Sequence, residues 1–159
     1  MIFAVNYKIM GFNIVLFEPE IPNNTGNIGR LALATNSVLH LVGPLGFELT
    51  DSKLKRAGLD YWKYLSLQFY NNIEEFYSTN HNKNLIYLSS HATQSHYEIS
   101  FEENMFLVFG KESQGLPKEI IERNHSNSFK IPMYSEKIRS LNLANAVSIV
   151  VYEGLRNLE

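Results

Sequence analysis

The chain has 159 residues, 45% of them hydrophobic, with a formal net charge of −2 and no cysteine. This length is typical of one domain with a buried core, and we expect a single domain over residues 1–159. The composition excludes disulfides, thiolate nucleophiles and cysteine-based zinc sites, and no apolar run reaches the roughly 20 residues of a membrane-spanning helix.

The first ten residues, MIFAVNYKIM, are mildly apolar. They do not resemble a secretory signal, because Lys8 follows the short apolar run instead of preceding it. Residues 1–9 are either an extension upstream of a start at Met10 or a short ordered arm. Without a targeting signal or disulfides, we expect a cytoplasmic protein.

Strand and helix patterns alternate along the chain. Asn13–Phe17 is a short apolar run that predicts a buried strand. The pattern of Thr25–Ser37 predicts a helix that begins at Asn24 or Thr25 and has Ile28 and Ala32 on its apolar face. Further elements follow: a strand at Val38–Val42, a basic helix at Asp51–Ala57, a strand at Leu65–Tyr70, a helix at Ile73–Ser78, strands at Leu85–Ser89 and Met105–Phe109, a helix at Pro117–Arg123, a strand at Phe129–Ile131 and a helix at Leu143–Leu158. This alternation predicts an α/β fold with a mostly parallel sheet flanked by helices.

Common enzyme motifs are absent. The chain has no G-x-G-x-x-G, G-x-S-x-G or H-E-x-x-H sequence, and the Gly110–Gly115 spacing is not followed by the Lys-Ser of a phosphate-binding loop. No pair of its five histidines has the spacing of a helical metal site, so we expect no metal.

The first candidate site is PNNTGNIGR, at Pro22–Arg30. A helix places Asn23, Asn27 and Arg30 on one face. In a helix that begins at Thr25, Arg30 lies near the positive end, where a cation is unfavourable by up to ~1 kcal/mol. The pattern indicates either a site for an anionic partner or an ordinary polar helix start with a surface arginine.

A basic patch follows. It combines cations with interleaved aromatic residues: Lys53, Lys55, Arg56 and Lys63 with Tyr61, Trp62 and Tyr64. The net charge of −2 argues against a protein that coats nucleic acid nonspecifically, but a local patch can still contact RNA. The alternative is a solvated helix beside an aromatic packing cluster.

The second candidate site is FGKESQGLP, at Phe109–Pro117, directly after a predicted buried strand. Ligands of open α/β sheets bind at the carboxyl ends of strands. Gly110 and Gly115 allow tight turns and close approach of a ligand to the backbone, and Glu112 is expected to point into the crevice. The alternative is a strand-to-helix turn in which Pro117 begins the helix.

The third candidate site is IPM at Ile131–Met133, followed by RSLNLAN at Arg139–Asn145. The last helix then carries a polar stripe that faces a ligand, loop or second subunit, or simply packs: Asn145, Ser148 and Tyr152. Beside it lies an apolar stripe that is wider than a solvent-facing helix needs: Leu143, Ala146, Val147, Val150 and Val151. We therefore expect a homodimer through this helix.

Together, FEPEIPNNTGNIGRL, GLDY, FGKESQGLP and IPM followed by RSLNLANAVSIVVYE resemble the SPOUT methyltransferases, and within them the YibK/TrmL-like tRNA ribose 2′-O-methyltransferases. The resemblance spans Asn13 to Leu158. It implies the SPOUT fold with a C-terminal trefoil knot, S-adenosylmethionine as cofactor, and a tRNA anticodon stem-loop as partner. The implied target is the wobble pyrimidine, cytidine or a modified uridine, of leucine tRNAs.

The resemblance also implies roles for individual residues. The cofactor is expected to contact Leu88, Ser89, Gly110, Glu112, Gly115, Ile131, Met133, Ser140, Leu141 and Asn142. The expected catalytic residues are Arg30, Glu112 and Asn145, and the expected substrate contacts are Asn23, Asn27, Arg30, Lys55 and Arg56. One departure is that Lys111–Gln114 stands where relatives often have Pro-Glu-Thr-Arg, which moves a basic residue by three positions.

The ribose 2′-hydroxyl needs a group that accepts its proton. Arg30 is a poor base because its pKa exceeds ~12, so it is either held neutral in a dry site or clamps a phosphate while another oxygen takes the proton; we favour the clamp. Glu112 is expected to orient the loop or the ribose, and the alternative is that it acts as the base itself. Alternative functions are 2′-O-methylation of another RNA such as rRNA, RNA binding without catalysis, and a flavodoxin-like nucleotide-binding domain.

Overall fold

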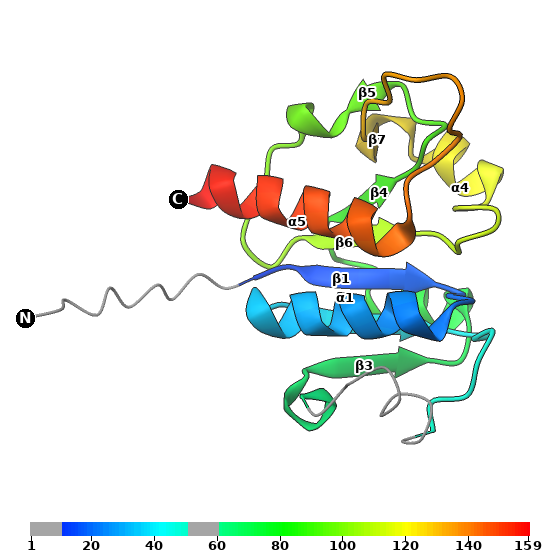
Figure 1. Ribbon diagram of the computed structural model, residues 1–159, viewed down its shortest axis with the longest axis vertical. Helices are drawn as coiled ribbons and strands as arrows, with labels where there is room; N and C mark the ends of the chain where they lie inside the picture. Colours follow the sequence, from blue (N-terminus) through cyan, green and yellow to red (C-terminus); the bar gives the residue numbers. More distant parts are fainter. Residues whose placement is uncertain (1–10, 51–60) are drawn as a thin grey trace, which may run out of the picture.

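The computed structural model describes residues 11–50 and 61–159 (Figure 1). Two predictions lie outside the described residues. They are the nature of residues 1–9 and the basic helix at 51–57, which carries Lys53, Lys55 and Arg56.

A seven-stranded parallel sheet forms the centre of the fold, in the order β3-β2-β1-β6-β4-β7-β5. Its strands are β1 (Asn13–Phe17), β2 (Val38–Val42), β3 (Leu67–Tyr70), β4 (Leu85–Leu88), β5 (Gln94–Ser95), β6 (Phe106–Phe109) and β7 (Ser128–Lys130). The predicted α/β class with a parallel sheet is confirmed. The two-residue edge strand β5 carries too short a pattern to be found in the sequence.

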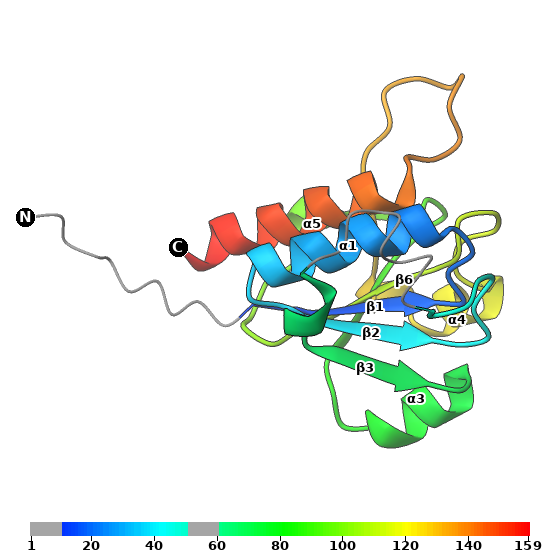
Figure 2. The same ribbon diagram turned by 60° about the horizontal axis from the view of Figure 1, so that its bottom comes forward.

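Helices cover both faces of the sheet (Figure 2). On one face α1 (Pro22–Ala34) lies beside α5 (Leu143–Leu158), and on the other lie α3 (Ile73–Thr79) and α4 (Lys118–Arg123). Short 3-10 helices complete the fold: η1 (Trp62–Tyr64), η2 (His96–Glu98) and η3 (His125–Asn127). Among the described residues, no helix is long and apolar enough to cross a membrane.

Strand β1 shows why the central strands are continuous apolar runs. Ile14 and Leu16 belong to the core cluster beneath α1 and α5. Val15 and Phe17 belong to the second cluster, with Phe76 of α3. Because both faces of a parallel sheet are covered, the side chains of such a strand are mostly apolar, and the buried polar exception in β2, His40, is paired with Asn13 and Tyr70.

Helix α1 begins earlier than predicted. Its first residue is Pro22, whose fixed φ and missing N–H suit a first helical position, and the residue before it, Ile21, makes no side-chain cap. Arg30 is therefore the ninth of 13 residues and not near the positive end. The argument that Arg30 opposes the helix dipole was wrong, although Asn23, Asn27 and Arg30 are all exposed, as their spacing predicted.

Helix α5 has the predicted bounds, but part of its apolar stripe serves another purpose. Val147, Val150 and Val151 are completely buried inside the chain's own core. They cannot contact a second subunit, so this reason for a dimer was wrong. The apolar side chains that α5 does expose are Ile149 and Tyr152, at 40% and 56%.

Candidate functional site

Four predicted cofactor residues meet at one edge of the sheet. Strand β4 lies between β6 and β7, and Leu88 pairs in register with Phe109 on one side and with Phe129 on the other. The backbone N–H of Ser89 donates to the carbonyl of Phe129 at 2.9 Å. Leu88 and Ser89 thus lie at the same edge as Gly110, which follows β6, and Ile131, which follows β7.

The loop between β6 and α4 requires both of its glycines. The N–H of Gly115 donates to the carbonyl of Lys111 at 2.8 Å, which closes a tight turn, and Gly115 has a φ of +70°. A Cβ on Gly110 would collide with the backbone of Gly115 and Leu116. The glycines therefore serve the turn itself: Gly110 leaves no space for a side chain, and Gly115 has a positive φ that glycine adopts without strain.

Glu112 binds the start of α1. Its carboxylate accepts hydrogen bonds from the N–H of Glu20 at 2.7 Å, the N–H of Ile21 at 3.1 Å and Nδ2 of Asn24 at 3.2 Å. The N–H groups at a helix start lack partners within the helix and carry partial positive charge, so the carboxylate supplies the cap that Ile21 lacks. Glu112 therefore orients the loop, the first of the two roles expected of it.

The same two loops are joined by further bonds. Glu20 accepts from the N–H and the Oγ of Ser113, both at 2.9 Å. The hydroxyl and then the N–H of Ser113 lower the pKa of the Glu20 carboxyl. Lys111 forms an ion pair with Glu18 at 3.0 Å. The cation at 111 thus holds the end of β1 to the loop, whereas Gln114, where the resemblance led us to expect arginine, is exposed.

Two asparagines extend this network to α5. Asn142 caps α5, accepting from the N–H of Ala144 at 2.9 Å and of Asn145 at 3.3 Å. Its Nδ2 donates to Oδ1 of Asn24 at 3.0 Å, and Asn24 in turn donates to Glu112. The sequence marked Asn24 only as a helix start, yet it is the link between loops from three parts of the chain.

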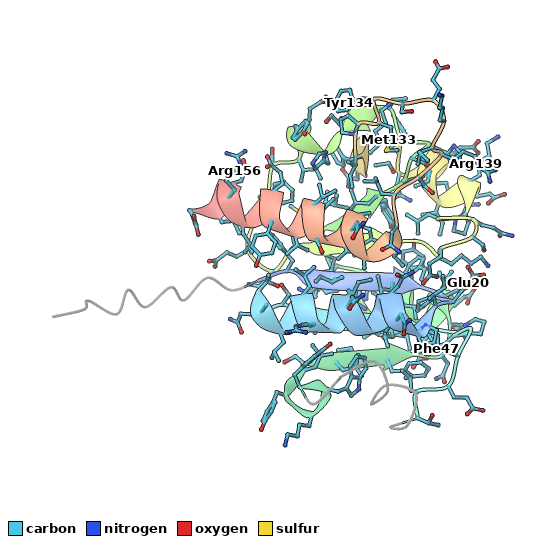
Figure 3. All side chains as sticks on the ribbon, viewed as in Figure 1. Glu20, Phe47, Met133, Tyr134, Arg139 and Arg156 are labelled. Atoms are coloured by element: carbon cyan, nitrogen blue, oxygen red, sulfur yellow. The ribbon has the colours of Figure 1, made fainter. Side chains whose placement is uncertain are left out.

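A cleft of about 360 Å³ lies beside this network, between the β4–β5 connection and the loop that follows β7. It is lined by Ser90, Lys130, Ile131, Pro132, Met133, Ile138 and Arg139. Figure 3 labels Met133, Tyr134 and Arg139 along this loop, and Figure 2 shows that it projects beyond α1 and α5. Ile131 and Met133 were predicted, whereas Lys130 and Arg139 add positive charge that the site prediction did not include.

The remaining predicted cofactor residues, Ser140 and Leu141, are exposed at the end of this loop. Within the described residues, no three histidine, aspartate or glutamate side chains are placed to hold a metal ion. The site thus offers backbone groups, apolar side chains and two cations. This donor set fits an organic molecule with a carboxylate.

Arg30 lies apart from these loops. It follows Pro22 by eight residues, which is about 12 Å along the helix axis from the turn that Glu112 caps. Asn145 is exposed in the first turn of α5. Within one chain the structure thus brings Glu112 close to the cofactor loops but does not bring Arg30 there.

Tyr61 stands beside Arg30. The guanidinium carbon lies 5.9 Å from the centre of the Tyr61 ring, and the phenol donates to the carbonyl of Gly26 at 2.9 Å. Lys63, from the same predicted patch, lies over the ring of Tyr64 at 5.0 Å. Lys55 and Arg56 fall outside the described residues.

Known proteins resemble the chain over most of its length. The model of the SpoU rRNA Methylase family matches residues 11–152. A tRNA (cytidine(34)-2′-O)-methyltransferase of Saccharophagus degradans is 49% identical over 92% of this chain and 96% of its own length. One of the same name from Escherichia coli is 42% identical over 92% of this chain and 93% of its own.

Solved structures agree. One, described as giving insights into the 2-OH methylation of C/U34 on tRNA, superposes with a TM-score of 0.86 at 43% identity, covering 92% of this chain and 95% of its own. An S-adenosylmethionine-bound rRNA methyltransferase from Sinorhizobium meliloti has a TM-score of 0.81 at 25% identity. That match covers 94% of this chain and 57% of the other.

Proposed function

The chain belongs to the SpoU rRNA methylase family, and on that premise we propose that it transfers a methyl group from S-adenosylmethionine to the ribose 2′-oxygen of nucleotide 34 in tRNA. The observation that carries the proposal is the 49% identity, over nearly the full length of both chains, to a tRNA (cytidine(34)-2′-O)-methyltransferase. The candidate site supports it, since the cleft is lined by the IPM motif, Ile131–Met133, and by Arg139, the first residue of RSLNLAN.

The cofactor is expected in the cleft beside the ends of β4 and β7 and against the neighbouring end of β6. Backbone groups at Leu88, Gly110 and Ile131 are available to a nucleoside, and Met133 and Ile138 provide apolar surface. Lys130 and Arg139 can meet the carboxylate of the methionine part. A related methyltransferase of known structure binds S-adenosylmethionine, which supports this choice of ligand.

The bound cofactor supplies an electrophilic methyl group for in-line attack by the ribose oxygen. The protein has to orient the ribose and stabilise the phosphates on either side of it. Arg30, exposed beside Asn27 and Asn23, is suited to a bidentate clamp on a phosphate, because its planar guanidinium matches that geometry. Asn145 offers an exposed amide to the ribose.

We propose that two chains complete the site. The separation between Arg30 and the cofactor loops of its own chain makes a second protomer the natural source of the clamp. The exposed apolar side chains of α1 and α5, Leu33, Ile149 and Tyr152, offer a surface for a two-fold dimer. Burial of the α5 valines excludes a dimer through those residues but leaves this outer face available.

Three further expectations belong to the same proposal. Residues 1–159 form one SPOUT domain, and its C-terminal part is knotted. The knot is expected from the fold that the chain shares with a solved methyltransferase structure at 43% identity and a TM-score of 0.86. A tRNA substrate also implies a cytoplasmic location.

The experiment is to map ribose methylation in tRNA from cells with and without the protein, and to repeat the reaction with purified protein and labelled S-adenosylmethionine. We expect the 2′-O-methyl group at pyrimidine 34 to be lost, with leucine acceptors the first species to examine. Loss of a methyl group from rRNA, with position 34 unchanged, would refute the substrate but keep the chemistry. Binding of tRNA without any methyl transfer would support the non-catalytic alternative.

A further inference from the structure

The 3-10 helix η1, with Tyr61 just before it, packs against α1 beside Arg30. The η1 segment lies along α1, and the second glycine of the motif GNIGR, Gly29, makes room for it. A Cβ on Gly29 would lie 2.8 Å from Cζ3 of Trp62 and 3.2 Å from Cδ2 of Leu65. The absence of a side chain at Gly29 therefore lets the aromatic segment pack directly against the helix that carries Arg30.

Tyr61 is held at both ends of its side chain. Its phenol donates to the carbonyl of Gly26, one helical turn before Arg30, and its neighbour Trp62 is fixed against Gly29. The Tyr61 ring is partly buried, and its centre lies 5.9 Å from the Arg30 guanidinium carbon. A fixed ring at this distance attracts a cation, so Tyr61 limits the directions in which the long Arg30 side chain can extend.

We propose that Tyr61 is a positioning residue for Arg30, whose ring holds the guanidinium in the orientation that the tRNA phosphate requires. This inference rests on the proposed function, because it gives Arg30 its substrate contact. Among the described residues Arg30 forms no ion pair, so the aromatic face is the contact that orders it before tRNA binds. An ion pair would neutralise the charge intended for the phosphate, whereas a ring leaves it available.

Tyr61 is not suited to accept the ribose proton. Burial raises the pKa of its phenol, and the nearby Arg30 charge only partly opposes this. The phenolic hydrogen is also used by the Gly26 carbonyl. The ring face, and not the hydroxyl, is the functional part of the side chain, and this distinguishes the expected effects of two substitutions.

The test compares Tyr61→Phe, which keeps the ring, with Tyr61→Leu, which removes it. Displacing a substrate-orienting group by about 1 Å can cost up to about 100-fold in rate. We expect kcat for methylation of tRNA to fall about tenfold in Tyr61→Leu and to stay within about threefold of wild type in Tyr61→Phe. The KM for S-adenosylmethionine should change by less than about twofold in both, because Tyr61 lies along α1 and not at the cleft. Tyr97→Leu, which removes an exposed tyrosine from η2, is the matched control and should retain full activity.

A second variant keeps the test valid if Tyr61→Leu fails to fold. Tyr61→Met keeps the apolar bulk without an aromatic face and should show the same fall in kcat at an unchanged thermal midpoint. In tRNA affinity, Tyr61→Leu should have its effect only when Arg30 is present, so the double variant with Arg30→Ala should bind no more weakly than Arg30→Ala alone. Equal kcat for Phe, Leu and Met variants, or additive losses in the double variant, would overturn the inference. If wild-type protein methylates no tRNA, it is the proposed function that fails.

Discussion

Glu112 offers a sharp test because two roles predict different results. In the structure its carboxylate accepts from two backbone N–H groups at the start of α1 and from Asn24. The alternative role is a general base for the ribose hydroxyl. Glu112→Gln removes the charge at constant size and distinguishes the two.

The expected loss can be worked out from these bonds. A glutamine side chain has one acceptor oxygen, so its NH₂ group faces at least one of the N–H donors that the carboxylate now satisfies. Hydrogen bonds to a charged group contribute about 1.5–3 kcal/mol, and the charge at a helix start adds about 0.3–1 kcal/mol. Because Glu112 is only partly buried, we take the lower end and expect Glu112→Gln to reduce the free energy of unfolding by about 2 kcal/mol.

The assay is urea unfolding at one fixed protein concentration, since assembly would otherwise change the apparent stability. With a slope of about 2 kcal/mol/M, the midpoint should fall by about 1 M. Glu103→Gln, in an exposed turn, removes the same charge and is the control. A Glu112→Gln protein with wild-type stability and no turnover would refute the capping argument and favour the general base.

Three other substitutions or conditions test separate parts of the molecule. His40 in β2 is buried against Tyr70 and Asn13, and burial lowers its pKa from 6.5 to about 4. The folded state therefore disfavours the proton, so stability is complete above pH 6.5 and should fall by about 3 kcal/mol as pH drops to 4; a flat profile of urea midpoints, or one that a His40→Gln variant reproduces, would contradict this. Gly110→Ala should abolish S-adenosylmethionine binding in calorimetry, because its Cβ meets loop backbone that cannot move aside; near-wild-type affinity would show that the turn tolerates a side chain. Arg30→Ala should lose methyl transfer while cofactor affinity stays within a few-fold, and Arg30→Lys should also be poor, because lysine lacks the bidentate geometry; efficient turnover by the lysine variant would indicate a simple point charge.

The central strands and the last helix could be predicted because their patterns are local. β1 and β2 have the predicted bounds, since strands covered on both faces read as continuous apolar runs. α5 also has its predicted bounds, and Asn142 provides the side-chain cap that a helix start favours. The start of α1 was misplaced because its cap comes from Glu112, 91 residues from Ile21 along the chain. No local pattern can show such a partner.

The candidate site was predicted as three separate motifs, and what joins them could not be predicted. The bond from Asn142 to Asn24 spans 118 residues, and β6 lies between β1 and β4 although β4 precedes it in the chain. The order of the strands in the sheet determines which motifs meet, and this order cannot be read from local sequence patterns. The width of the α5 apolar stripe was misinterpreted for a related reason. Sequence periodicity shows how many apolar residues share a face, but not whether they are buried in the chain's own core.

The structure divides the proposed site into two parts with different physical demands. The loops after β1 and β6 are fixed by charge-assisted bonds through Glu112, Glu20 and Lys111, which suits a cofactor that must be held in one bent shape. The exposed face of α1 is ordered mainly by the contact of Arg30 with Tyr61, which suits a large RNA that arrives and leaves in every cycle. Substitutions in the loop network should therefore lower stability and cofactor affinity together. Substitutions on the α1 face should lower turnover and tRNA affinity but leave stability and cofactor affinity unchanged. Salt should weaken tRNA binding. The slope of log affinity against log salt concentration should be shallow, because few phosphates are contacted, and it should be shallower still in Arg30→Ala. An equal slope in wild type and Arg30→Ala would mean that Arg30 contacts no phosphate, and the clamp would have to be abandoned.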